Sequence, residues 1–172
     1  MKLRSRVTAI AAAGLLGLIA AGLAGCGGSS STTAATATAK AARPAPTIRS
    51  AGRAYLRLVS PNNKRIDELN RQAKKLANTD LAGWKDLYRS WYLVEHSYIG
   101  GLSQIRWPHQ MRPIVNSLIR ASAAEAEMRR TIARASSFEE MNGYWTEEGR
   151  LTRAQNVAVS VLRANLRLPQ VP

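Results

Sequence analysis

The sequence predicts an all-α protein in which residues 49–168 form an up-down antiparallel four-helix bundle. Apolar residues recur every three or four positions along four stretches of this region, which is typical of helices that bury one face. No stretch shows the strict alternation of apolar and polar residues that marks a strand. The connections near residues 79, 106 and 136 are short, which favours antiparallel neighbours.

The first helix is predicted from about Arg49 to a break at Asn78-Thr79. Its apolar stripe keeps its phase across Pro61, which indicates a kinked helix or two helices nearly in line. A Ser60 cap with Pro61 in the first helical turn is the alternative description. The stripe consists of Tyr55, Val59, Asn62, Ile66, Leu69, Ala73 and Leu76.

The second and third helices have weaker end signals. Asp80 is a good N-cap for the second helix, and Gly100-Gly101 weakens its end. Its stripe is Trp84, Leu87, Trp91, Val94, Tyr98, Leu102 and Ile105. Trp107-Pro108 is predicted to start the third helix, because proline suits a first turn. The third stripe is Ile114, Leu118, Ala121, Glu125, Met128, Ile132 and Ala135.

The fourth helix has the clearest start. Ser137 and Glu140 match a capping box, in which each side chain satisfies a backbone N–H of the other residue. The fourth stripe is Phe138, Met141, Trp145, Glu148, Thr152, Gln155, Val159, Leu162 and Leu166. Residues 169–172, which begin with Pro169 and end with Pro172, are expected to form a C-terminal tail.

The N-terminus carries the pattern of an exported protein. Lys2, Arg4 and Arg6 precede an uncharged, mostly apolar run from residue 7 to 23. The run ends in Leu23-Ala24-Gly25-Cys26, which resembles the lipobox of bacterial lipoproteins. That resemblance implies a signal peptide of residues 1–25, cleavage before Cys26, and a diacylglycerol on the Cys26 thiol. Cys26 is the single cysteine of the chain, so it has no disulfide partner.

Residues 26–48 are expected to be the lipidated cysteine and a disordered tether, because they contain few bulky apolar residues. No other long apolar run follows, so the mature protein is expected to be anchored to the membrane without spanning it. The Arg-rich, Ala-rich helical part resembles helical envelope lipoproteins of high-GC bacteria. This is a likeness of fold and implies no activity.

The chain is strongly basic, with a formal charge of +14. Removing Lys2, Arg4 and Arg6 with the signal peptide leaves about +11, since all 11 acidic residues lie later in the chain. Export argues against nucleic acid as the partner. The charges are spread along the helices without a block of like residues, which favours a generally solvated basic surface over a dedicated polyanion site.

Polar residues on the inward stripes are the best candidates for a site. Reflecting the helices about their turns places two sets at similar heights: Asn62, Glu95 and Gln155, and Tyr88, Glu125 and Glu148 with Asn70 nearby. Facing carboxylates on Glu125 and Glu148 could bind a metal or share a proton. The simpler interpretation puts them at the edge of the stripe, where they reach water or an arginine such as Arg120, Arg129 or Arg150.

Signatures of catalysis are missing from the sequence. Neither histidine lies three residues after a glutamate, as a ferritin-like di-metal site requires. The sequence has no G-x-S-x-G, no H-E-x-x-H and no phosphate-binding glycine loop. The four tryptophans could line a ligand slot, but in a bundle of this size they are expected to fill the core: Trp84, Trp91, Trp107 and Trp145.

We therefore expect no catalytic residue, no metal ligand and no cofactor. The predicted function is a non-catalytic interaction or scaffold module, held by lipid on the extracytoplasmic face of the cell membrane. The predicted partners are the membrane itself and an envelope protein or anionic wall polymer. The alternative is a sensor or carrier that binds a small molecule or metal between the helices.

Overall fold

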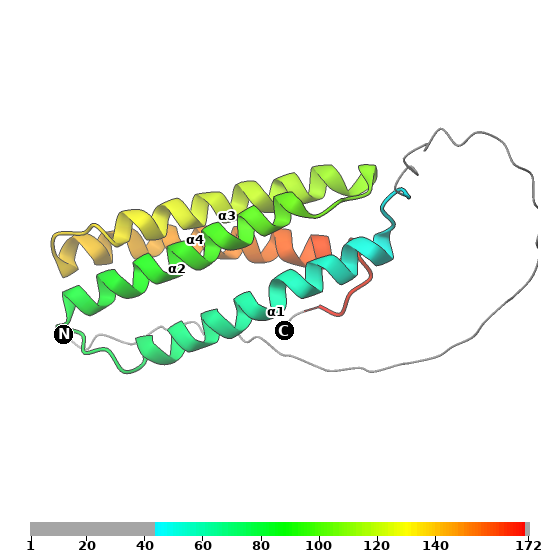
Figure 1. The fold of residues 1–172 in the computed structure, drawn as a ribbon. Coiled ribbons are helices and arrows are strands. Elements are labelled where there is room, and N and C mark those ends of the chain that lie inside the picture. Colours follow the sequence, from blue (N-terminus) through cyan, green and yellow to red (C-terminus); the bar gives the residue numbers. More distant parts are fainter. Residues whose placement is uncertain (1–43, 171–172) are drawn as a thin grey trace, which may run out of the picture.

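The structure, a computed structural model, describes residues 44–170. The predicted signal peptide, the lipidation site Cys26 and most of the predicted tether lie outside these residues. The described chain contains four α-helices and one 3₁₀ turn, and no strand. The elements are α1 (Ile48–Ala73), α2 (Leu81–Gln104), η1 (His109–Met111), α3 (Arg112–Ile132) and α4 (Phe138–Asn165). They form an antiparallel four-helix bundle, as the sequence predicts (Figure 1).

The bundle has a proximal and a distal end. The proximal end holds the start of α1, the connection between α2 and α3, and the end of α4. The distal end holds the connections 74–80 and 133–137. None of the helices in residues 44–170 combines the length and apolar character that crossing a bilayer requires.

Helix α1 is capped and unbroken. The side chain of Thr47 accepts a hydrogen bond from the Ser50 amide, and Ser50 Oγ accepts one from the Thr47 amide. The helix runs through Pro61, so the two-helix alternative with a Ser60 cap is wrong. Pro61 lies on the exposed side of the helix, where the backbone carbonyl that it leaves without a partner can face solvent.

The ends of α2 combine a predicted and an unpredicted feature. Asp80 caps the start by accepting a 2.8 Å hydrogen bond from the Gly83 amide, as predicted. Gly100 and Gly101 lie inside the helix, which continues to Gln104. A Cβ at Gly101 would clash with the side chain of Leu58 on α1, whereas one at Gly100 would meet open space. Gly101 therefore permits the close approach of α1 to α2.

The third helix starts later than predicted. Trp107 and Pro108 precede η1, and α3 begins only at Arg112, with Pro113 in its first turn. Trp107 is buried in the core instead, and its indole N–H donates a 2.8 Å hydrogen bond to the carbonyl of Leu102 in the last turn of α2. The apolar ring thus covers the end of α2, which explains why it does not belong to α3.

The start of α4 is a modified capping box. Ser137 accepts a hydrogen bond from the Glu140 amide, as predicted. The Glu140 carboxylate accepts from the amide and hydroxyl of Ser136, one residue earlier than a capping box requires. At its other end α4 closes at Arg167, whose φ of 57° lies in the left-handed region. This turn brings Leu168 back against the core.

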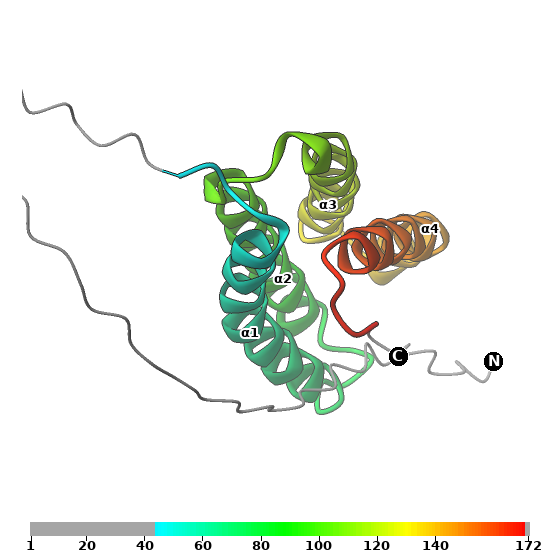
Figure 2. The same ribbon diagram turned by 90° about the vertical axis from the view of Figure 1, so that its right-hand side faces the viewer.

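The helices pack in chain order, α1 on α2, α2 on α3 and α3 on α4, while α1 and α4 touch little. Figure 2 shows α1 and α4 on opposite sides of the bundle, with the chain after α4 turning back between them. At the proximal end all four helices share one apolar cluster: Ala51, Tyr55, Tyr98, Leu102, Trp107, Met111, Val115, Leu118, Leu162 and Leu166.

Two separate clusters fill the distal end. One joins α2, α3 and α4 around Tyr88, Ile132 and Met141. The other joins only α1 and α2, around Leu69, Ala73 and Leu87. The distal half of α1 therefore packs on α2 alone. This explains why Asn62 and Ile66, which lie on the predicted stripe, are only half-buried. Val59, also on the stripe, is half-buried as well but packs against the proximal cluster.

The predicted stripes have the correct helical period, but the set of residues that they predict to be buried is partly wrong. On α3, Ser122 and Arg129 are buried although neither was on the predicted stripe, because a helix packed between two neighbours buries a wider face. Trp107 is buried, and Trp84 and Trp91 are half-buried. The expectation that the tryptophans fill the core is wrong for Trp145, which is 42% exposed.

Candidate functional site

A buried arginine lies at the centre of a charged network inside the distal half of the bundle. Arg129 of α3 is 7% exposed, and its guanidinium contacts a carboxylate from each of three helices. Nη2 donates to Glu125, one turn earlier on α3. Nη1 lies 3.4 Å from Glu95 Oε2 on α2, and Nε lies 3.9 Å from Glu148 Oε1 on α4. The fork of the guanidinium allows one side chain to serve all three acids.

An aromatic ring covers the same guanidinium. The guanidinium carbon of Arg129 lies 5.9 Å from the ring centroid of Trp91, a cation–π contact that stabilises a positive charge. Tyr88 packs edge-on against Trp91, with 5.2 Å between ring centroids. Trp91 therefore serves the charged network as well as the core.

Neutral polar side chains complete the network. Thr152 donates a 2.8 Å hydrogen bond to Glu125, and Tyr88 donates a 3.0 Å hydrogen bond to Glu148. The amide of Gln155 donates both to Glu95 and, at 2.9 Å, to Ser122. The network thus connects α2, α3 and α4. Two buried atoms in it, Glu125 Oε2 and Arg129 Nε, make no hydrogen bond.

The two heights predicted from the sequence agree with part of this arrangement. Glu95 meets Gln155, and Tyr88 meets Glu148, as the reflection of the helices predicts. Asn62 does not join, since its amide donates to the Leu58 carbonyl of its own helix.

The surroundings predicted for the Glu125 and Glu148 carboxylates also differ from those in the structure. Glu125 does not lie at the edge of the stripe near water, because it is fully buried. Of the three arginines proposed as partners only Arg129 contacts it, while Arg120 bonds to Ser117 and Arg150 pairs with Glu147.

Burial shifts the protonation of the network. Loss of solvation raises the pKa of Glu95 to about 7, against the opposing effect of Arg129. Burial also raises the pKa of Glu148, and the nearby Arg129 only partly offsets it. The pKa of Tyr88 is raised by burial and then by the adjacent Glu148, so the phenol keeps its proton and acts as a donor. With a pKa of about 7, the Glu95 carboxyl is partly protonated near neutral pH.

The chemistry of the network is therefore that of internal charge compensation. In the described part of the chain no three His, Cys, Asp or Glu side chains are placed to hold a metal ion together. Arg129 supplies the counter-charge that a cation would otherwise provide to Glu125 and Glu148. A buried network of this kind can fix the register of the helices that it connects.

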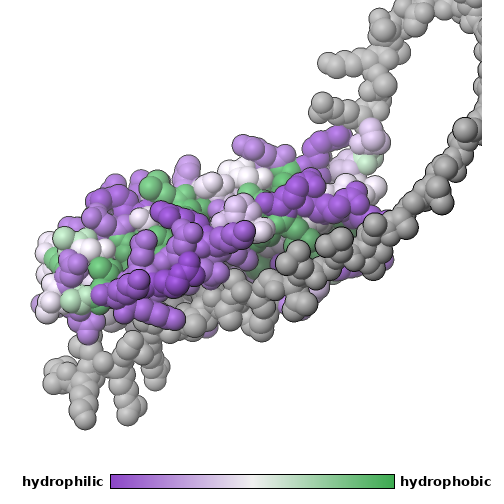
Figure 3. All heavy atoms as spheres, turned by 60° about the horizontal axis from the view of Figure 1, so that its bottom comes forward, coloured by the Kyte–Doolittle hydropathy of each residue, from purple (hydrophilic) through white to green (hydrophobic). Residues whose placement is uncertain are grey.

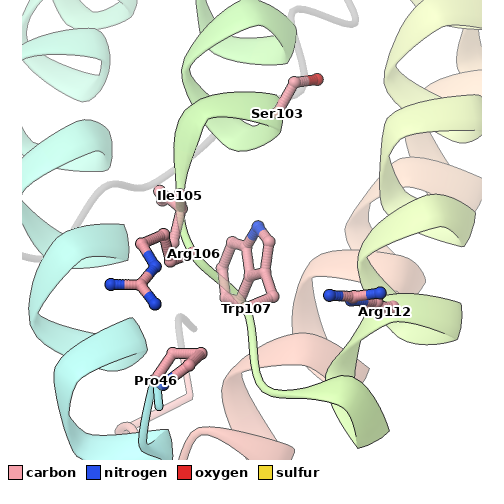
Figure 4. A pocket seen from close by; sticks show the side chains of 6 residues that line it. All are labelled: Pro46, Ser103, Ile105, Arg106, Trp107 and Arg112. Atoms are coloured by element: carbon pink, nitrogen blue, oxygen red, sulfur yellow. The ribbon is translucent and has the colours of Figure 1, made fainter. Parts of the chain in front are cut away.

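Two surface hollows of the described chain lie at the proximal end, away from this network. One, of about 310 Å³, is lined by Pro46, Ser103, Ile105, Arg106, Trp107 and Arg112. In Figure 4 the side chains of Arg106 and Arg112 lie on either side of Trp107. A second, of about 400 Å³, is lined by His109, Arg112, Pro113, Asn116, Ser117 and Arg120. Arg112 borders both, and no carboxylate lines either.

Sequence reasoning did not find these hollows, because their residues come from a connection outside the apolar stripes. The usable signal was the absence of Asp and Glu from residues 96–124. Comparison with known protein families, characterised proteins and solved structures gives no match.

Proposed function

We propose that the protein is a lipid-anchored protein of the bacterial cell envelope, in which the bundle works as a non-catalytic interaction module outside the membrane. The observation that carries the proposal is Leu23-Ala24-Gly25-Cys26, which follows a basic segment and an apolar run as a lipobox does. Acyl chains on Cys26 would hold the protein on the outer face of the membrane.

The interior of the bundle supports an interaction role over a role in binding small molecules between helices. The buried acids of α2, α3 and α4 are bound to Arg129, Thr152, Gln155 and Tyr88. The two hollows at the proximal end open on the surface, and arginine side chains line both. The groups that remain available to a partner are therefore surface groups.

The anchor is tested on protein purified from the membranes of a bacterium that processes lipoproteins. Intact mass spectrometry should show a chain that starts at Cys26 and carries acyl mass. Cys26→Ser should lack that mass and leave the membrane fraction or stay unprocessed. Ser29→Ala, three residues later, is the matched control and should be acylated normally. A wild-type chain that starts at Cys26 with a free thiol would overturn the proposal.

A further inference from the structure

The charges of the protein are separated along the axis of the bundle. All 11 acidic residues fall in two stretches, 67–95 and 125–148, and the fold places both stretches toward the distal end. Residues 44–66, 96–124 and 149–170 contain no acidic residue; they make up the proximal half of the bundle and reach just past its middle. Their basic residues are Arg49, Arg53, Arg57, Lys64, Arg65, Arg106, Arg112, Arg120, Arg150, Arg153, Arg163 and Arg167. We call this surface the basic end.

Most of the basic end is exposed and unpaired. Every one of these side chains except Arg163 is exposed. Only Arg65 and Arg150, near the middle of the bundle, form ion pairs within the described residues. The other ion pairs of the surface lie in the distal half, between Arg89 and Asp86 and between Arg130 and Glu127. The positive charge at the basic end is therefore available to an external anion.

Helix α1 contributes a regular stripe to the basic end. Arg49, Arg53 and Arg57 recur every four residues, so they lie on one exposed side of the first turns of α1. Like charges at this spacing destabilise a helix slightly, and no carboxylate in the described chain pairs with them. Figure 3 shows the face to which α1 contributes, where hydrophilic side chains cover most of the surface. The three arginines therefore add nothing to the stability of the helix, and their charges are available to a binding partner.

The two hollows belong to the same end. Arg106 and Arg112 border the first, and Arg112 and Arg120 border the second. A guanidinium presents its N–H groups in a planar fork that matches the oxygens of a phosphate. The basic end thus offers both a diffuse positive field and two recesses in which phosphate groups could be held.

We propose that the basic end docks on the anionic phospholipid headgroups of the membrane that carries the anchor. This inference rests on the proposed function, because lipid on Cys26 is what brings a bilayer close. About eighteen residues separate Cys26 from Pro44, and a chain of that length spans at most ~60 Å. The described chain enters the bundle at the basic end, so the anchor presents this end to the bilayer. Acyl chains and a polybasic surface are two membrane signals that act together.

The docking is tested without the anchor. Residues 27–172 lack Cys26 but keep every packing contact described for residues 44–170. This chain should sediment with phosphatidylcholine vesicles that contain phosphatidylglycerol, less so as salt is raised, and not with pure phosphatidylcholine vesicles. The triple variant Arg49→Gln, Arg53→Gln, Arg57→Gln should bind on the order of 100-fold more weakly, at about five-fold per side chain.

The matched control removes three charges from the last turn of α1 and the connection that follows it: Arg71→Gln, Lys74→Gln and Lys75→Gln. These side chains are exposed and lie outside the basic end, so the loss should be less than about three-fold. Circular dichroism checks that both variants stay helical. Arg112→Gln, which changes both hollows, is a second variant and should also weaken binding.

Three results would overturn the docking. The first is equal loss in the two triple variants. The second is equal binding to charged and neutral vesicles. The third is binding to soluble poly(glycerol phosphate) without binding to vesicles, which would assign the basic end to a wall polymer. The anchor is measured separately, by acyl mass on Cys26. A free thiol on Cys26 together with intact vesicle binding would contradict the proposed anchor and support the docking. Acyl mass on Cys26 without vesicle binding would support the anchor and contradict the docking.

Discussion

Replacing Glu95 by Gln should stabilise the bundle at alkaline pH and leave it unchanged at acid pH. In the folded protein the pKa of Glu95 is about 7, against an ordinary value of 4.5. Below pH 4.5 the carboxyl is protonated in both states, so its contribution to stability is fully present. As pH rises from 4.5 to beyond 7 the unfolded chain loses the proton first, and the stability falls. The difference between the two pKa values corresponds to about 3 kcal/mol.

Gln keeps the shape of a protonated glutamate and does not ionise. Denaturant unfolding of residues 27–172, followed by circular dichroism, should therefore show the Glu95→Gln variant more stable than wild type at pH 8, by up to about 3 kcal/mol. At pH 4 the two should agree. Glu127→Gln is the control, because Glu127 is exposed on α3 and pairs only with Arg130; it should change stability by less than about 0.5 kcal/mol.

The opposite sign at pH 8 would refute this reasoning. If Glu95→Gln were less stable than wild type there, Glu95 would be ionised in the folded protein and required as a counter-charge for Arg129. The stabilisation from the ion pair between Glu95 and Arg129 would then exceed the free-energy cost of burying the Glu95 charge.

The remaining predictions concern two other features of the fold. Arg129→Met leaves the fully buried Glu125 without its counter-charge and should cost about 3–5 kcal/mol, whereas the neighbouring exposed Arg130→Met should cost less than about 1 kcal/mol by denaturant unfolding. Equal losses would show that Arg129 is not the centre of the network. Gly101→Ala should lower the melting temperature, at a cost of about 1–3 kcal/mol, because its Cβ would clash with Leu58. Gly100→Ala, on the open side of α2, should raise it, since alanine favours a helix by about 1 kcal/mol over glycine. Two shifts of the same sign would contradict the packing of α1 on α2.

The fold could be predicted because its signals are local. Helical period, the Asp80 cap and the Ser137 cap depend on residues close in sequence, and all three are present in the structure. The start of α3 could not be predicted from local signals. Proline prefers the first turn of a helix, but Trp107 and Pro108 precede α3 because the Trp107 ring packs over the end of α2.

The candidate site could be predicted only in part. Heights along antiparallel helices follow from counting residues, so Glu95 and Gln155 were matched correctly. Arg129 at the centre was not placed inside, because its position depends on how far α3 is rotated between two neighbours. The separation of acidic and basic residues along the bundle could not be predicted from the sequence for a similar reason. Stretches without acidic residues are far apart in the sequence, and only the antiparallel fold brings them together at one end.

The contact between α1 and the chain after α4 determines how the bundle carries mechanical load. A Cβ at Gly52 would lie 3.8 Å from the Leu166 carbonyl oxygen, and the neighbouring Ala51 and Tyr55 are fully buried. A pull on the chain before Thr47 reaches this contact first. The distal turns of α1 pack on α2 alone, so we expect them to open on heating before the first turns of the helix. Force applied through the N-terminus has to shear the firmest turns before it reaches them, so the helix is held most strongly where an anchored protein would be pulled.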